Sequence, residues 1–264
     1  MTFASVRQID ALVAILREAE TELTLAVERS LMSGNLGTAS FQSQQLAEIQ
    51  ALLQQVRGET VPRAVEILRV TYKEGLKVAS LSGLSESSPF SGIHEEAVKV
   101  LSDSMTQRLD DAFATVGRRV EDVFRKEGLR LSALQLAEGS TRVEASASLV
   151  DALKRQGITA FQDRAGREWG LTRYSDMVLR TTTREATSEG TRNRLIEGGL
   201  DLVEWVAAAD CCDRCQEFAG KVFSLTGATD GYEVLDELPP IHPNDICVIV
   251  PATVTLNELE KAFA

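Results

Sequence analysis

The chain of 264 residues has little sulfur, little histidine and few aromatic side chains: four cysteines, two histidines and 5% Phe, Trp and Tyr. Few aromatic residues favour helices that pack through Leu, Val and Ala. The sequence has no run of about 18 apolar residues, which excludes a membrane-spanning helix. The first segment, MTFASVRQIDALVAILREAE, mixes charged and apolar residues, unlike a secretory signal. We therefore expect a protein that is made and kept in a cytoplasm.

Two common enzyme signatures are also missing. The sequence contains neither the phosphate-binding pattern G-x-x-x-x-G-K-[ST] nor the nucleophile elbow G-x-S-x-G. The net charge of −11 is concentrated in residues 201–264, which hold 12 acidic and 3 basic side chains. An acidic surface repels phosphate, so we expect no tight binding to duplex DNA through this region, whereas a basic protein partner would suit it.

Residues 5 to about 156 have the periodicity of packed helices. Apolar side chains recur every three or four residues in three stripes, which begin at Ile9, Val61 and Val98. The third stripe predicts a helix from about His94 to about Leu131, roughly 55 Å long. Such a length predicts an elongated helical region over residues 1–156, with breaks near Gly34 and Gly37 and over residues 82–92.

Residues 157–264 lack the continuous helical periodicity of the first region, and their short apolar runs and turn residues predict a small α+β module. ITAFQD and REWGLT predict two short strands around a turn, and a helix is expected from about Arg173 to Glu197, ended by two glycines. Residues 201–209, 220–225 and 247–251 predict three further strands. A last short helix is expected from Thr255, which is spaced from Glu258 as in a capping box. The predicted fold class is therefore α+β, mainly α, with regions 1–156 and 157–264.

Three of the four cysteines lie close together in AADCCDRCQEFAGKVFSL. Cys212 and Cys215 form C-x-x-C, and IHPNDICVIVP adds His242 and Cys247, with 26 residues between Cys215 and His242. Two such loops can supply a Cys₃His set for a structural zinc ion, with Cys211 as a spare donor. Free thiols that pack as small apolar groups are an alternative, and a disulfide would need an oxidising compartment.

Residues 155–252 resemble the C-terminal region of tailed-phage minor capsid (minor head) proteins, of the Mu F-like and phage minor capsid type. The similar pieces are D-x-A-G-R-x-W, which includes Trp169; the helix with Tyr174 and Arg180; the C-x-x-C followed by GKVFSL; and PPIHPND. Several pieces in the same order are more specific than any one of them. The family usually has HPNC-x-C where this chain has HPND-I-C, so Asp245 stands at the first of those cysteines. Asp245 is therefore an alternative ligand to Cys247.

The resemblance implies a structural protein of the virion, not an enzyme. Proteins of this type associate with the portal vertex or the inner capsid during head assembly in the host cytoplasm. The implied partners are the portal protein, the major capsid protein and, as a further alternative, other copies of the chain. Neither a membrane nor a specific nucleic acid sequence is expected as a partner.

Two enzyme classes remain as alternatives. A zinc deaminase would combine His94 and Glu96 with the C-x-x-C, but more than a hundred residues separate these elements and no proline precedes Cys212. An ADP-ribosyltransferase carried in the phage head would use Arg180, Ser224 with Thr226, and the pair Glu258 and Glu260. The simpler interpretation is that Glu258 caps a helix and that Arg180 pairs with a nearby carboxylate or carbonyl group.

Overall fold

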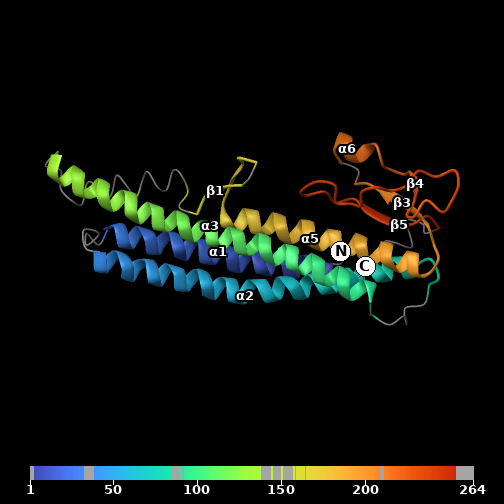
Figure 1. Cartoon of the computed structure of the whole chain (residues 1–264), viewed down its shortest axis with the longest axis horizontal. Coiled ribbons are helices and arrows are strands. Elements are labelled where there is room, and N and C mark those ends of the chain that lie inside the picture. The colour runs from blue at the N-terminus through green and yellow to red at the C-terminus, as the bar shows by residue number, and fades with distance from the viewer. Residues whose placement is uncertain are drawn as a thin grey trace. The chain divides into compact units, whose positions relative to one another are not determined.

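The computed structural model shows a mainly helical protein with a small C-terminal strand module (Figure 1). It describes residues 3–32, 39–84, 90, 92–137, 144, 150, 157, 159–163, 165–208 and 211–253. The helices are α1 Phe3–Met32, α2 Ala39–Ser80, α3 Ile93–Ala137, α5 Leu171–Glu197 and α6 Asp213–Gln216. The predicted helices from about His94 and from about Arg173 are thus confirmed as α3 and α5. The predicted breaks at Gly34 and Gly37 and the predicted final helix lie outside the described residues.

The strands form two small antiparallel sheets. β1 Phe161–Gln162 pairs with β2 Glu168–Trp169, as the sequence predicted for this hairpin. β3 Leu202–Val206 lies between β4 Val222–Ser224 and β5 Val248–Pro251, so the order of the second sheet is β4-β3-β5. The three strands expected between residues 201 and 251 are confirmed, although each is shorter than predicted.

The chain divides into two compact units, each built from segments that are distant in the sequence. One unit combines residues 1–11, 63–107 and 177–264, and the other combines residues 12–62 and 108–176. Each long helix therefore contributes to both units. The predicted division at residue 157 and the predicted elongation remain predictions.

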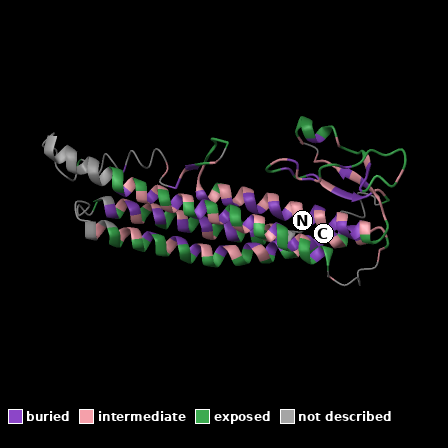
Figure 2. Ribbon diagram, viewed as in Figure 1, coloured by how far each residue is buried: buried purple, intermediate pink, exposed green. Residues whose placement is uncertain are grey.

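In the unit of residues 12–62 and 108–176, the buried residues follow the periodic stripes of the sequence (Figure 2). The apolar side chains recur on one face of each helix because 3.6 residues make a turn. The hairpin packs through Tyr174, whose ring meets Phe161 at 5.2 Å and Trp169 at 5.7 Å between centroids. The indole N–H of Trp169 donates to Asp163 at 2.9 Å. The hairpin is thus fixed by an aromatic cluster and a carboxylate.

In the other unit, α2 and α5 approach each other at two glycines. A Cβ atom placed on Gly75 would lie 2.1 Å from the carbonyl oxygen of Thr187, and one on Gly190 would lie 2.3 Å from the carbonyl oxygen of Tyr72. The hydroxyl groups of Thr187 and Thr191 donate to the carbonyl oxygens of Thr71 and Gly75 on α2, at 3.2 and 3.1 Å. The two backbones can approach this closely only because neither glycine has a side chain.

The same unit contains a buried polar network around His94, which is 1% exposed. Its Nδ1 atom lies 3.0 Å from the hydroxyl oxygen of Tyr72, and its Nε2 atom lies 2.9 Å from a carboxylate oxygen of Glu197. The side-chain amide of Asn193 donates to the same hydroxyl group at 2.9 Å. The network joins α2, the first turn of α3 and the last turns of α5, and burial raises the pKa of Tyr72 to about 12.

We expect Tyr72→Phe to destabilise the protein by about 1–2 kcal/mol at pH 7, because the buried Nδ1 atom of His94 and the buried amide of Asn193 both lose their hydrogen bond to the hydroxyl group. The wild-type protein should also lose stability as the pH rises from about 10, the ordinary pKa of tyrosine, towards 12. This direction follows from the raised pKa of Tyr72. The neutral side chain stabilises the folded state fully below the unfolded-state pKa of about 10, and this contribution is lost as the pH rises through about 12. Urea unfolding at pH 7 and at pH 9–12 measures both effects. The exposed Tyr232→Phe is the control, and equal stability of the two variants at pH 7 would contradict the prediction.

Candidate metal centre

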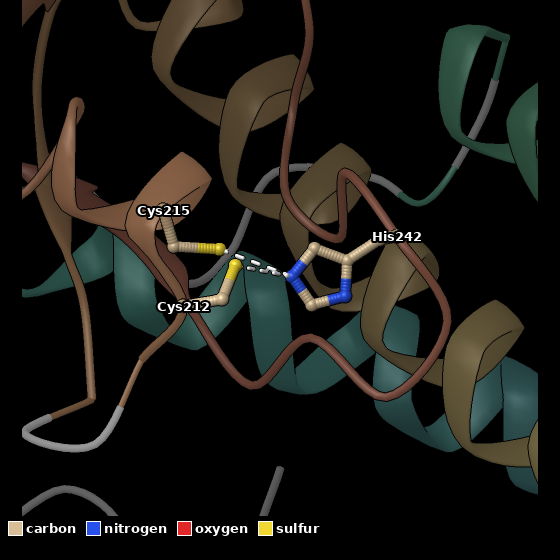
Figure 3. A group of neighbouring side chains, drawn as sticks. All are labelled: Cys212, Cys215 and His242. Carbon is tan, nitrogen blue, oxygen red and sulfur yellow. Dashed lines mark hydrogen bonds between the residues drawn. The ribbon is translucent and has the colours of Figure 1, made fainter.

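The two cysteine-bearing segments meet beside the second sheet. Cys212 immediately precedes α6, Cys215 lies within it, and His242 comes from the segment that leads into β5 (Figure 3). The Nε2 atom of His242 lies 3.3 Å from the sulfur of Cys212 and 3.2 Å from the sulfur of Cys215. Because β3 pairs with both β4 and β5, the sheet holds these segments side by side although 26 residues separate Cys215 from His242.

A second group of donor atoms shares Cys215 with the first. The sulfur atoms of Cys215 and Cys247 and a carboxylate oxygen of Asp245 all lie within 4.8 Å of one another, as do the donor atoms of Cys212, Cys215 and His242. Cys215 and Cys247 are each 1% exposed and belong to the core cluster that includes Trp205, whereas Cys212 is exposed. Cys215 is therefore the residue around which the predicted ligands gather.

His242 is oriented so that Nε2 faces the sulfur atoms. Its Nδ1 atom lies 3.0 Å from the carbonyl oxygen of Pro243, a distance at which an Nδ1–H group donates a hydrogen bond. This bond leaves Nε2 as the free lone pair, which is the usual arrangement of a histidine that binds a metal. The hydrogen bond to Pro243 and the nearby Cys212 sulfur raise the pKa of His242.

Asp245 organises the loop that carries His242 and Cys247. One carboxylate oxygen accepts the backbone N–H of Ile241 at 2.9 Å, and the other accepts the backbone N–H of Cys247 at 2.8 Å. Although burial alone would raise it, the pKa of Asp245 is lowered by the Cys247 thiol and these amides. The side chain of Arg184, on α5, donates to the Asp245 carbonyl oxygen at 3.0 Å. Both Asp245 oxygens are therefore already engaged, which favours Cys247 as the remaining ligand.

The three thiols of the cluster differ in electrostatics. The backbone N–H of Cys215 favours a thiolate at Cys212 and lowers its pKa. Burial raises the pKa of both Cys215 and Cys247. A buried thiolate needs a compensating charge, and a bound cation provides one.

The donor set and its spacing fit a tetrahedral zinc site. With bonds of about 2.3 Å to sulfur and about 2.0 Å to nitrogen, ligand atoms in a zinc tetrahedron lie roughly 3.5–3.8 Å apart. The observed sulfur–nitrogen distances of 3.2 and 3.3 Å are close to this spacing. The cluster of Cys212, Cys215, His242 and Cys247 is thus compatible with a metal ion.

The other predicted site residues lie elsewhere. Cys211 is a free, half-buried thiol and is absent from both donor groups found among the described residues. Arg180 pairs with Asp10 at 2.6 Å, so its partner is the carboxylate of α1. Tyr174 and Trp169 form the hairpin cluster described above. Cys211, Arg180, Tyr174 and Trp169 are all absent from the two donor groups found among the described residues.

The residues of the two enzyme alternatives have structural partners. His94 is bound within the Tyr72 network, away from the C-x-x-C. The hydroxyl groups of Ser224 and Thr226 both donate to Asp201, at 2.5 and 2.6 Å. Glu258 and Glu260 lie outside the described residues.

Sequence reasoning missed the arginine on α6 that braces the histidine loop. Arg214 donates to the Ile241 carbonyl oxygen at 3.1 Å and pairs with Glu237 at 2.9 Å. Only its position inside the C-x-x-C pointed to it, because a charged residue between two cysteines is otherwise unremarkable. The role of Asp245 in holding its loop together was also missed. Its partners are the backbone amides of Ile241 and Cys247, which no sequence pattern reveals.

The fold and this cluster together define a class: a helical protein with a small, cysteine- and histidine-bearing strand module and, within the described helices, no segment apolar and long enough to cross a membrane. The model of the family described as phage minor capsid protein 2 matches residues 6–237, most of the chain. The chain belongs to this phage minor capsid family, and it is a structural protein of the phage head and therefore of the virion. No curated protein and no solved structure matches it.

The family match covers more of the helical region than the predicted resemblance. The resemblance covers residues 155–252, whereas the match begins at residue 6 and therefore includes the long helices. It contains Cys212 and Cys215 but ends before His242 and Cys247. The helical part is thus shared by the family, and the histidine loop lies beyond the matched part.

Proposed function

We propose that this protein binds the portal or the inner capsid shell during phage head assembly in the host cytoplasm, and that it is of the Mu F-like type. The observation that carries the proposal is the family match over residues 6–237. The acidic balance of residues 201–264 supports contact with a basic protein surface. Self-association within the assembly is part of the proposal.

We propose further that this role involves no catalysis. Among the residues that the structure describes, the polar side chains considered for catalysis make structural hydrogen bonds, as in the pairs Ser224–Asp201 and His94–Glu197. Acyl or glycosyl transfer would need a nucleophile or base and an anion-stabilising donor directed at one point. Incubation with labelled NAD should leave no modified product, and a labelled product would favour the ADP-ribosyltransferase alternative.

Co-purification tests the assembly role. The tagged protein, produced together with the portal and capsid proteins of its phage, should sediment with portal rings or with empty heads. A variant that lacks residues 201–264 shows whether the acidic module is needed. If the full chain stays at the top of the gradient while heads form without it, the proposal is wrong.

We also propose that the cluster binds one structural zinc ion through Cys212, Cys215, His242 and Cys247. Zinc would supply the positive charge that the buried sulfur atoms need and would join α6 to the loop before β5. The supporting observations are the convergence of the donor atoms and the orientation of His242 by Pro243. Elemental analysis of the purified protein should return about one zinc per chain. Metal-free protein with four freely reactive thiols would contradict this proposal.

A further inference from the structure

The sheet of the C-terminal module has an additional edge beyond β4. The backbone N–H of Ser224 donates to the carbonyl oxygen of Glu233 at 2.8 Å, and the N–H of Leu235 donates to the carbonyl oxygen of Ser224 at 2.9 Å. These two bonds form a parallel bridge between Ser224 and Val234. Glu233, Val234 and Leu235 therefore lie beside Ser224 at the end of β4, within the edge segment of residues 232–236.

The backbone groups of Val234 face away from β4. In a parallel bridge of this kind, the bonds to Ser224 come from the residues on either side of Val234, so the N–H and C=O of Val234 itself point outward. Among the residues that the structure describes, neither group has a backbone partner. An open edge with a free donor and a free acceptor is a template for another extended chain.

Along residues 232–236 the side chain of Leu235 is buried and the other four side chains are exposed. Leu235 is 8% exposed and belongs to the core cluster, whereas Tyr232 and Val234 are 44% and 48% exposed. Large apolar side chains this exposed are few in the module, and two of them lie at alternate positions of the same edge. Tyr232 and Val234 form an apolar surface that alternate side chains of an added strand can contact.

The charges around the edge select the kind of strand that fits. Glu233 and Asp236 are exposed carboxylates of the segment, Asp230 is an exposed carboxylate two residues before it, and Glu237 is paired with Arg214. A second copy of the chain would bring like charges together, and nucleic acid would bring its phosphates to the same carboxylates. An extended segment with basic side chains has the complementary charge.

We propose that the edge formed by residues 232–236 binds an extended basic segment of another protein by strand addition. Val234 supplies one donor and one acceptor to the added backbone, Tyr232 and Val234 contact its apolar side chains, and the carboxylates attract its Lys and Arg residues. The proposal goes beyond the assembly role because it names the surface and the chemistry of the partner. It rests on that role only for the expectation that the partner is a head protein.

A synthetic peptide of alternating Lys or Arg and Val residues is the probe. We expect it to bind the full-length protein, more weakly as salt is added, and to slow hydrogen exchange at the Val234 amide measured by NMR. The matched probe has the same sequence with an N-methyl group on every Val and on every Lys or Arg, so that both edges of the peptide lose their donors. It should bind at least tenfold more weakly. Equal binding of the two peptides would show charge attraction without strand addition and would overturn the proposal.

Glu233→Lys tests the contribution of charge without changing the backbone contacts. It should weaken peptide binding about fivefold at low salt. Asp103→Lys, at an exposed position of α3, makes the same change in net charge and should leave binding unchanged. If both variants weaken binding equally, the attraction belongs to the whole protein and not to this edge.

Sedimentation without peptide tests the second copy as occupant. The protein should show no self-association that depends on the edge, and an association abolished by Val234→Lys would overturn the proposal in favour of edge-to-edge pairing. This test can be separated from the test of the assembly role. If the protein co-purifies with heads but does not bind the peptide, only the proposed edge is rejected. If it binds the peptide but does not co-purify with heads, only a head protein as the source of the partner is rejected.

Discussion

Replacing Cys215 by Ser should abolish binding of the proposed zinc ion and destabilise the strand module by about 4 kcal/mol or more, the range associated with loss of a structural metal. Cys215 belongs to both donor groups, so no arrangement of the remaining ligands restores the site. It is also part of the core cluster with Trp205 and Cys247, where the substitution would replace a buried sulfur by a smaller and more polar hydroxyl group. Elemental analysis, thermal unfolding and tryptophan fluorescence measure the loss.

The helical far-UV signal of Cys215→Ser should stay largely intact, because most buried side chains of α1, α2 and α3 lie outside the core cluster that contains Cys215. Cys211→Ser is the matched control: it also removes one thiol from the segment, but that thiol is absent from the donor groups, so zinc content should not change. If Cys215→Ser retains one zinc per chain, or if Cys211→Ser loses it, the proposed ligand set is wrong.

Gly75→Ala should destabilise the protein by about 3 kcal/mol or more, because the new methyl group would overlap the carbonyl oxygen of Thr187. The distance of 2.1 Å leaves no room, and the obstacle is backbone, which cannot move as a side chain does. Separating α2 from α5 would also break the hydrogen bonds from Thr187 and Thr191 to α2. Urea unfolding followed by circular dichroism measures the effect, and Gly190→Ala should behave in the same way.

Gly117→Ala is the control for this pair of variants. It also replaces a glycine inside a long helix, but its methyl group would meet only the Leu53 side chain, at 3.6 Å. It should be neutral or stabilising by about 0.5–1 kcal/mol, since alanine is the better helix former. Equal destabilisation by Gly75→Ala and Gly117→Ala would mean that the close approach of α2 and α5 is not what the glycines provide.

The long helices could be predicted from the sequence because their signal is local. In α3, apolar residues recur every three or four positions from Val98 to Phe124, and such a stripe has one simple structural meaning. The strands were predicted with less accurate ends, because strand length depends on pairing with partners distant in sequence. β4, for example, is limited to three residues by its register with β3.

In the candidate site, too, residue types could be read from the sequence, whereas contacts between distant segments could not. The residue types and the C-x-x-C spacing predicted Cys212, Cys215, His242 and Cys247 as candidate ligands, and the structure brings their donor atoms close together. The preference for Cys247 over Asp245 remains a proposal, and its support could not come from the sequence, because it depends on the amides that the Asp245 oxygens accept. The brace from Arg214 could not be predicted either.

By itself, the sequence determined the helical periodicity and the acidic charge of residues 201–264, and it predicted the candidate metal donors and the resemblance to phage minor capsid proteins, all of which depend on residue type and local spacing. Only the tertiary structure decided that Gly75 and Gly190 lie where two helix backbones meet, that Asp245 caps a loop, and that Val234 stands at an open sheet edge. The physical reason is that these roles are defined by backbone groups brought together from distant segments, and every residue carries the same backbone groups.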